Sequence, residues 1–305
     1  MRNTDTFRQY IWLINTLQRA KKMSLKSIQE RWIDDDLNSG QPLTRSTFIR
    51  IKAAVEDMFG ILIHCDRKDG NLYYIGNPET FKDNTTQNWM LQTLTVNNVL
   101  IDSLSIKDRL VLEEIPEGLE YLQTIIKAIK NNLILEMTHQ SFDSPAPKTI
   151  TIEPYCLKVF RQRWYILVKS DQHPNELRIY ALDRITKLEE TNQTFVMDPD
   201  FNACNFFKHY FGVFVSEKEK PVHIVLRAHG NKMISLLRTL PKHQSQKEII
   251  TEIDFSDFEY YLAPTLDFKH EILKEGADLE VLEPQSLRKE IKTKILSSLE
   301  HYQTR

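Results

Sequence analysis

Three segments near the start of the chain carry apolar residues at helical spacing. The first runs from Thr6 to about Ala20. The second is expected to start close to Ser24, a suitable N-cap, and to end before Asp34. The third is expected to follow the cap Thr44 and to stop at Gly60, with apolar positions at Phe48, Ile51, Val55 and Met58. The pattern therefore predicts three successive helices, with a polar loop before the third.

After Gly60 the apolar positions alternate, as they do in β-strands. Residues 61–64 and 72–75 form two such runs, and Asp69-Gly70, a common hairpin turn pair, lies between them. This pattern predicts a two-stranded hairpin with a charged tip. Three helices followed by a hairpin is the order of a winged helix-turn-helix, whose third helix enters the major groove of DNA while the hairpin lies along the backbone.

The charges of the third helix and of the hairpin fit this interpretation. We predict that DNA is contacted by Arg45, Ser46, Thr47, Arg50, Lys52, Arg67 and Lys68. The other interpretation is that these are ordinary solvated groups, because four neighbouring acidic residues nearly cancel the positive charge: Glu56, Asp57, Asp66 and Asp69. The order of the elements, more than the charge, favours DNA binding.

The rest of the chain predicts an α+β multidomain protein. Helical spacing predicts a packed helical connector, and short strands then suggest a small barrel. We expect the aromatic segment Phe201–Phe214 to be helical, and the last part to be an α/β sandwich with a helix from about Asp257. The expected boundaries are 1–80 for the winged helix, 81–131 for the connector, 132–195 for the barrel, 196–220 for a second connector and 221–305 for the C-terminal domain.

The composition limits the possible classes of protein. With 305 residues, 41% of them hydrophobic, and a formal net charge of -2, the chain is globular, and any nucleic-acid contact must come from a local patch. It shows no apolar signal region and no stretch of about 18 uncharged apolar residues, so we expect a cytoplasmic protein without a membrane contact. Cys65, Cys156 and Cys204 lie far apart, which fits a reduced compartment and gives no zinc pattern.

Several short motifs occur together in the predicted barrel and C-terminal domain. Residues 163–167 are Arg-Trp-Tyr-Ile-Leu, residues 177–185 are Leu-Arg-Ile-Tyr-Ala-Leu-Asp-Arg-Ile, and residues 152–155 are Ile-Glu-Pro-Tyr. These motifs resemble the WYL-domain family of bacterial transcriptional regulators, with Ile166 in place of the leucine of the family tripeptide. Residues 226–228, 240–246 and 281–284 resemble the family's C-terminal extension, called WCX. With the winged helix in front, the resemblance covers nearly the whole chain.

The resemblance implies a particular kind of regulator. The barrel is then of the Sm-like type and binds a ligand, in several members a nucleotide or a single-stranded nucleic acid, and it relays occupancy to the DNA-binding domain. Regulators of this build are typically homodimers that bind double-stranded operator DNA. Some relatives repress phage-defence operons and others respond to DNA damage.

The candidate ligand contacts in the barrel are His139, Tyr155, Arg163, Tyr165, Arg178 and Arg184. If residues 177–184 form one straight strand, Arg178 and Arg184 share a face, and guanidinium groups with aromatic rings suit an oligonucleotide. The alternative is that Asp183 or Glu153 pairs with these arginines in surface salt bridges. A lone histidine is likewise more often a hydrogen-bonded structural group than a ligand contact. We expect Trp164 on the opposite face to be core.

Metal binding and catalysis find little support in the sequence. Residues 34–38 begin like a calcium loop, but Ser39 and Arg45 stand where that loop needs Gly and Glu. His223 and His229 share a strand face without a third ligand. Because the common catalytic motifs are missing, we expect no metal, no cofactor and no enzyme. A second hypothesis is a nucleic-acid-binding adaptor or processing protein of a defence or repair system.

Overall fold

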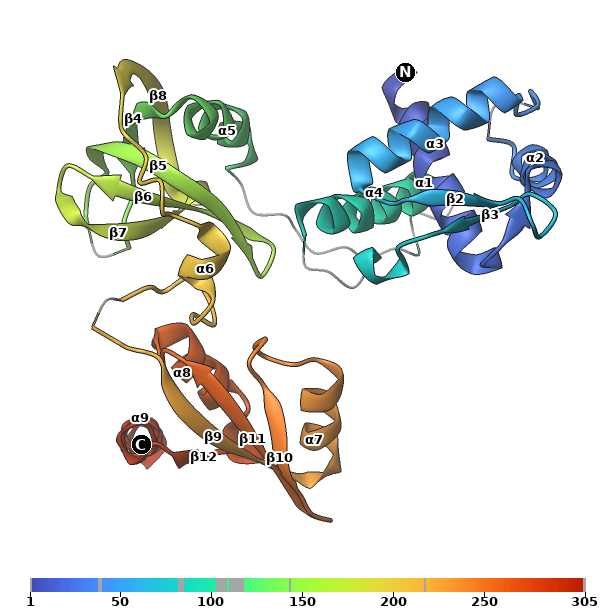
Figure 1. Cartoon of the computed structure of the whole chain (residues 1–305). Coiled ribbons are helices and arrows are strands. Elements are labelled where there is room, and N and C mark those ends of the chain that lie inside the picture. The colour runs from blue at the N-terminus through green and yellow to red at the C-terminus, as the bar shows by residue number, and fades with distance from the viewer. Residues whose placement is uncertain are drawn as a thin grey trace. The chain divides into compact units, whose positions relative to one another are not determined.

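A computed structural model describes residues 2–37, 40–81, 85–102, 109, 118–142, 144–216 and 218–303. Residue contacts divide the chain into two compact units, Met1–Leu112 and Glu113–Arg305 (Figure 1). The middle of the predicted helical connector, including residues 103–108 and 110–117, lies outside the described residues, as do residues 38 and 39 of the rejected calcium loop. The packed connector and the five-part division of the chain therefore stay predictions.

The N-terminal unit combines helices with a small antiparallel sheet. Its elements are α1 (Arg2–Ala20), β1 (Met23–Ser24), α2 (Leu25–Asp34), α3 (Arg45–Phe59), β2 (Ile63–Asp66), β3 (Leu72–Ile75), η1 (Pro78–Phe81) and α4 (Thr86–Asp102). The strands pair in the order β1-β3-β2. The helices α1, α2 and α3 thus precede the β2–β3 hairpin in the order that the apolar pattern predicts.

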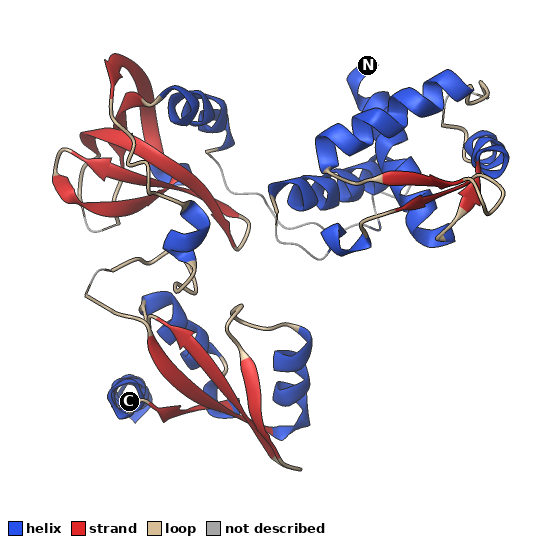
Figure 2. Cartoon of the chain, in the orientation of Figure 1, coloured by secondary structure: helices blue, strands red, loops and turns tan. Residues whose placement is uncertain are grey.

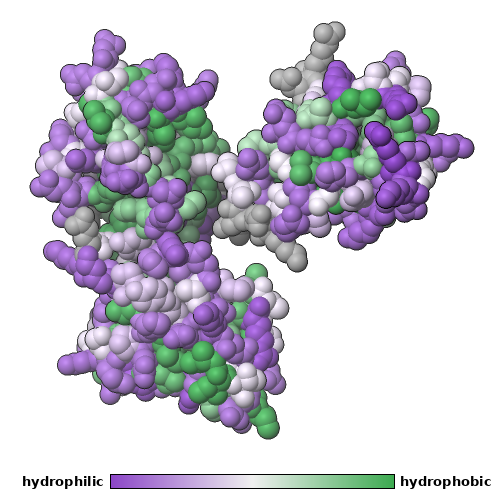
Figure 3. Space-filling model, in the orientation of Figure 1, coloured by the Kyte–Doolittle hydropathy of each residue, from purple (hydrophilic) through white to green (hydrophobic). Residues whose placement is uncertain are grey.

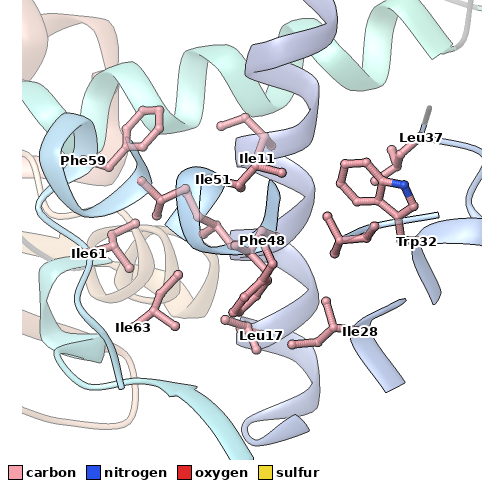
Figure 4. Packing of buried hydrophobic residues seen from close by; sticks show 14 of the residues in the cluster. Ile11, Leu17, Ile28, Trp32, Leu37, Phe48, Ile51, Phe59, Ile61 and Ile63 are labelled. Atoms are coloured by element: carbon pink, nitrogen blue, oxygen red, sulfur yellow. The ribbon is translucent and has the colours of Figure 1, made fainter. Parts of the chain in front are cut away.

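One apolar core fixes α3 against the other elements of this unit (Figure 4). The buried face of α3 is Phe48, Ile51, Val55 and Phe59, at the helical spacing found in the sequence. Residues of α1, α2 and the hairpin close this core: Ile11, Leu17, Ile28, Trp32 and Ile63. Burial of each large apolar side chain stabilises the unit by about 1.5–3 kcal/mol. Leu91 of α4 joins the same core, so α4 belongs to this unit.

The second unit contains two sheets and their helices (Figure 2). Its first part consists of η3 (Leu119–Tyr121), α5 (Leu122–Asn131), β4 (Leu133–His139), β5 (Lys148–Phe160), β6 (Arg163–Ser170), β7 (His173–Ala181), η4 (Leu182–Arg184) and β8 (Ile185–Thr194). Its second part consists of α6 (Ala203–Phe207), β9 (Val222–His229), α7 (Gly230–Thr239), β10 (Lys247–Thr251), β11 (Phe255–Leu262), α8 (Leu266–Lys274), η5 (Gly276–Asp278), β12 (Leu279–Glu283) and α9 (Gln285–Gln303).

The first sheet of this unit is antiparallel, in the order β7-β6-β5-β4-β8. A bulge between Pro154 and Cys156 interrupts the register of the long strand β5 with β6. Helix α5 packs Ile125 and Ala128 into the core of this sheet, whereas the sequence analysis assigned the helix to the connector. The expectation of one straight strand over residues 177–184 is wrong. Strand β7 ends at Ala181, and Leu182–Arg184 form a 3-10 turn that places the Leu182 side chain in the core.

The second sheet is antiparallel, in the order β10-β11-β9-β12, and α7, α8 and α9 pack on its apolar face. The helix predicted from about Asp257 is wrong, because that segment is strand β11, in which Phe258, Tyr260 and Leu262 are buried at a period of two. The following helix begins only at Leu266. Of the aromatic segment expected to be helical, only α6 is an α-helix. None of the described helices is long and apolar enough to span a bilayer.

Candidate nucleic-acid interface and ligand site

Helix α3 begins at a cap that engages two of the predicted DNA contacts. The hydroxyl oxygen of Thr44 accepts the backbone N–H of Thr47 at 3.2 Å, and it lies 3.0 Å from the hydroxyl of Ser46 and 2.9 Å from that of Thr47. At the other end, Gly60 adopts the left-handed conformation, with φ 65°, that commonly terminates a helix. The cap thus ties the Ser46 and Thr47 hydroxyls to the helix start, and Ser46 remains exposed.

Arg45 and Arg50 point away from the core of the N-terminal unit. Both side chains are exposed, and among the described residues neither forms an ion pair. The buried face of α3 lies on the other side of the helix, so the two guanidinium groups share the solvent side with Ser46 and Ala53. Figure 3 shows hydrophilic side chains over most of the visible surface of this unit, with separate apolar patches between them.

Lys52 is held by a neighbour, unlike the two arginines. Its ammonium group lies 2.8 Å from a carboxylate oxygen of Glu56, one helical turn further along α3. The same carboxylate accepts the backbone N–H of Ile63 at 3.0 Å and so joins α3 to strand β2. For Lys52 the structure therefore shows the neutralised charge that the second interpretation of the sequence described.

The hairpin tip carries Arg67 and Lys68 on a turn that the chain itself fixes. One carboxylate oxygen of Asp66 accepts the backbone N–H groups of Lys68 and Asp69, each at 3.2 Å, and Lys22 forms ion pairs with both acids at 3.0 and 3.2 Å. The hydrogen bond from Lys22 lowers the pKa of Asp66. Both acids of the tip are thus paired with Lys22, while Arg67 and Lys68 are exposed and, within the described parts of the chain, form no ion pair.

The start of α3 and the hairpin lie close together around one aromatic residue. The rings of Phe48 and Tyr73 meet edge to face at 4.7 Å. Burial and the neighbouring Cys65 raise the pKa of Tyr73, whereas the charges of Arg45 and Arg67 lower it. An effect of both guanidinium groups on one phenol requires that both lie near it, so cations of the helix and of the hairpin gather on one side of the unit.

In the second unit, three of the predicted ligand residues gather at one end of the first sheet. Arg163 donates two hydrogen bonds to Asp183, at 2.7 and 2.8 Å. Arg184 donates to the carbonyl oxygen of Gln140 at 3.0 Å, and its guanidinium stacks 3.6 Å from the centre of the exposed Phe142 ring.

His139 is the third residue of this cluster. Only 9% of its surface is exposed, its ring meets that of Tyr180 edge to face at 4.9 Å, and its Nε2 atom has no hydrogen-bond partner. Burial and the nearby charge of Arg184 lower the pKa of His139 to about 4, so the imidazole is neutral at physiological pH. An unpartnered buried nitrogen is costly unless something else satisfies it.

The strand register separates Arg178 from Arg163 and Tyr165. In the pairing of β6 with β7, Arg178 lies opposite Val168, which points into the core. Because side chains alternate along a strand, Arg163 and Tyr165 lie on the other face of the sheet. The expectation that these side chains lie on matching faces is therefore wrong, and Arg178 instead pairs with Glu176 at 3.1 Å.

Tyr155 and Trp164 make structural contacts. The Tyr155 ring stacks on Phe195 at 6.0 Å and meets Phe201 at 5.0 Å, next to the bulge in β5 and apart from the cluster of His139, Arg163 and Arg184. Trp164 packs against the core of the first sheet, as expected. Whether any of the predicted residues contacts DNA or a ligand stays a prediction.

Sequence reasoning missed several partners in both sites. Gln140 and Phe142 follow β4 directly but carry no recognisable motif, and Lys22 meets its acids across 44 positions of sequence. Asp183 was named only as a possible competitor for the arginines, and it is indeed the partner of Arg163. The exposed apolar residue Ile49 on α3 was overlooked, although its place between the apolar positions of the helix could have been noticed.

Comparisons with known proteins locate one domain of the chain. No curated protein matches it. Among solved structures, proteasome accessory factor B/C (PafBC) of Arthrobacter aurescens is 16% identical, with 94% of this chain and 45% of that chain covered and a TM-score of 0.37. A CRISPR Cas-related protein is 13% identical, with 86% and 65% covered and a TM-score of 0.40. The chain thus spans less than two thirds of the length of either. The model of the WYL domain matches residues 120–190, from η3 to β8, so the chain contains a WYL domain.

Proposed function

We propose that this protein is a DNA-binding transcriptional regulator, in which α3 and the β2–β3 hairpin bind an operator and the WYL domain senses an anionic ligand. The observation that carries the proposal is the set of unpaired cations on one side of the N-terminal unit: Arg45, Arg50, Arg67 and Lys68. Their placement on a helix and an adjacent hairpin matches the way a winged helix contacts a major groove and the flanking phosphates.

The cluster at one end of the WYL sheet supports the sensing part of the proposal. Arg163 and Arg184 supply guanidinium groups, and the exposed Phe142 ring offers a surface on which a base can stack. A phosphate would compete with Asp183 for Arg163, and the buried Nε2 of His139 is available to a ligand hydroxyl or amine. A nucleotide or a short single strand has all of these groups. We propose no catalytic role for the protein.

A second copy of the chain is the further partner that we propose. From Ile295 to Gln303 every residue of α9 is exposed, and this stretch carries Ile295, Leu296, Leu299 and Tyr302 at helical spacing. So short a helical end is not stable by itself in water, and an apolar stripe favours burial against a partner. Light scattering tests this directly: a homodimer has twice the mass of the 36.0 kDa chain, and a monomer at micromolar concentration contradicts it.

The central test is selection of duplexes from a random library by the whole chain. We expect a recurrent sequence and an affinity that falls steeply with salt. A trinucleotide single strand and free nucleotides are then added to the complex. Since coupling between two sites is reciprocal, a ligand that weakens operator binding must itself bind less tightly in the presence of operator. Binding to single strands without any duplex preference would instead support the adaptor hypothesis.

A further inference from the structure

Ile49 occupies a place on α3 where the fold does not require an apolar residue. It is 53% exposed and contributes nothing to the buried core, whose α3 residues are Phe48, Ile51, Val55 and Phe59. Large side chains that face water are normal when single, so exposure alone says little. Its surroundings carry the argument.

The neighbours of Ile49 on the helix surface are the predicted DNA contacts. Residues three and four positions away along a helix share a face, so Ile49 lies between Ser46 on one side and Ala53 on the other, with Arg45 also one turn away. Ser46 and Ala53 are small and exposed, and so leave the Ile49 side chain accessible to a surface that approaches α3. The unpaired Arg45 and Arg50 favour an approach by a polyanion.

The chemistry of the major groove leaves one apolar partner for such a side chain. The edges of guanine, cytosine and adenine present hydrogen-bonding groups there, whereas thymine also presents its C5-methyl group. A polar base edge placed against Ile49 would lose water without gaining a hydrogen bond, which is costly. A thymine methyl would instead bury apolar surface against it.

We infer that Ile49 is a specificity-determining residue that contacts a thymine methyl group and so selects an A·T pair at one position of each half-site. This inference rests on the proposed function, because it requires that α3 enters the major groove. The phosphate contacts of Arg45 and Arg50 would supply affinity without sequence preference, and Ile49 would add the preference.

The test removes the methyl group and nothing else. Duplexes selected by the whole protein are remade with deoxyuridine in place of one thymidine at a time, and their affinities are measured by fluorescence anisotropy. Burial of one methyl group corresponds to about a fourfold change in affinity, so we expect one thymine per half-site to show about that loss with the native protein. With Ile49→Ala, thymidine and deoxyuridine at this position should bind equally.

A matched control is Val96→Ala, which shortens another exposed apolar side chain of the N-terminal unit, on α4. This variant should keep the fourfold difference, and both variants should melt like the native protein because both side chains are exposed. Equal binding of all deoxyuridine duplexes by the native protein, or a difference that persists in Ile49→Ala, overturns the inference while the proposed function stands. Failure to select any duplex would overturn the proposed function itself.

Discussion

The sharpest prediction concerns the salt dependence of duplex binding by the double variant Arg45→Ala, Arg50→Ala. Four cations on α3 and the hairpin are exposed and unpaired: Arg45, Arg50, Arg67 and Lys68. Each phosphate contact contributes about 0.9 to the slope of log affinity against log salt, so four contacts per chain give a slope of about -3.6. Loss of two leaves about -1.8. Raising the salt from about 50 to about 200 mM then weakens the native complex roughly 150-fold and the variant roughly 12-fold.

The structure supplies the comparison variants for this measurement. Lys52→Ala removes a cation that is already paired with Glu56, so its slope should change by clearly less than 0.9. The variant Lys232→Ala, Lys289→Ala removes two exposed cations of the C-terminal domain and matches the change in net charge. Its slope should equal that of the native protein.

Fluorescence anisotropy titrations of a labelled duplex at five salt concentrations give the slopes, and thermal melting checks the fold. Because Arg45 and Arg50 are exposed and make no ion pair with any described residue, their removal should leave the melting temperature nearly unchanged. The reasoning is refuted if the double variant keeps the native slope. It is equally refuted if the C-terminal control flattens the slope as much, since the effect would then follow net charge and not position.

Three further predictions concern stability. The lowered pKa of His139 favours the neutral imidazole in the fold, so stability should fall as the pH drops from about 6.5 towards 4, by about 2 kcal/mol between pH 8 and pH 5; denaturant titrations of His139→Gln should lack this loss. Gly118→Ala would place a methyl carbon 2.5 Å from the Leu182 backbone at a φ of 96°, and denaturation should show a loss of about 1–3 kcal/mol; unchanged stability would contradict that geometry. Phe48→Ala should cost the N-terminal unit about 3–5 kcal/mol by the same assay, and a smaller loss would mean that its core collapses around the cavity.

The N-terminal unit could be predicted from the sequence because its signals are local. Thr44 and Gly60 mark the ends of α3 through hydrogen bonds and backbone conformation within one turn of the helix. Asp69-Gly70 marks the hairpin tip in the same way. The exposure of Arg45 and Arg50 followed from the apolar face of the same helix.

The second unit was harder to predict because its decisive contacts are long-range. The segment at Asp257 carries both polar and aromatic residues, and only pairing with β9 shows that it is a strand. The end of β7 at Ala181 depends on the burial of Leu182 in a core built from distant strands. Likewise the face on which Arg178 lies is set by its register with Val168, which no local pattern reveals.

The division of the predicted connector between two cores has a practical consequence. Helix α4 packs through Leu91 into the N-terminal core, and α5 packs through Ile125 into the WYL core, so neither described helix draws its burial from the other unit. A gene fusion made between these two helices would keep every residue that the structure places in either core. The DNA-reading half could then be transplanted in front of a different sensor, and a chimera that still bound the selected duplex would show that recognition and sensing are separable parts that evolution can recombine.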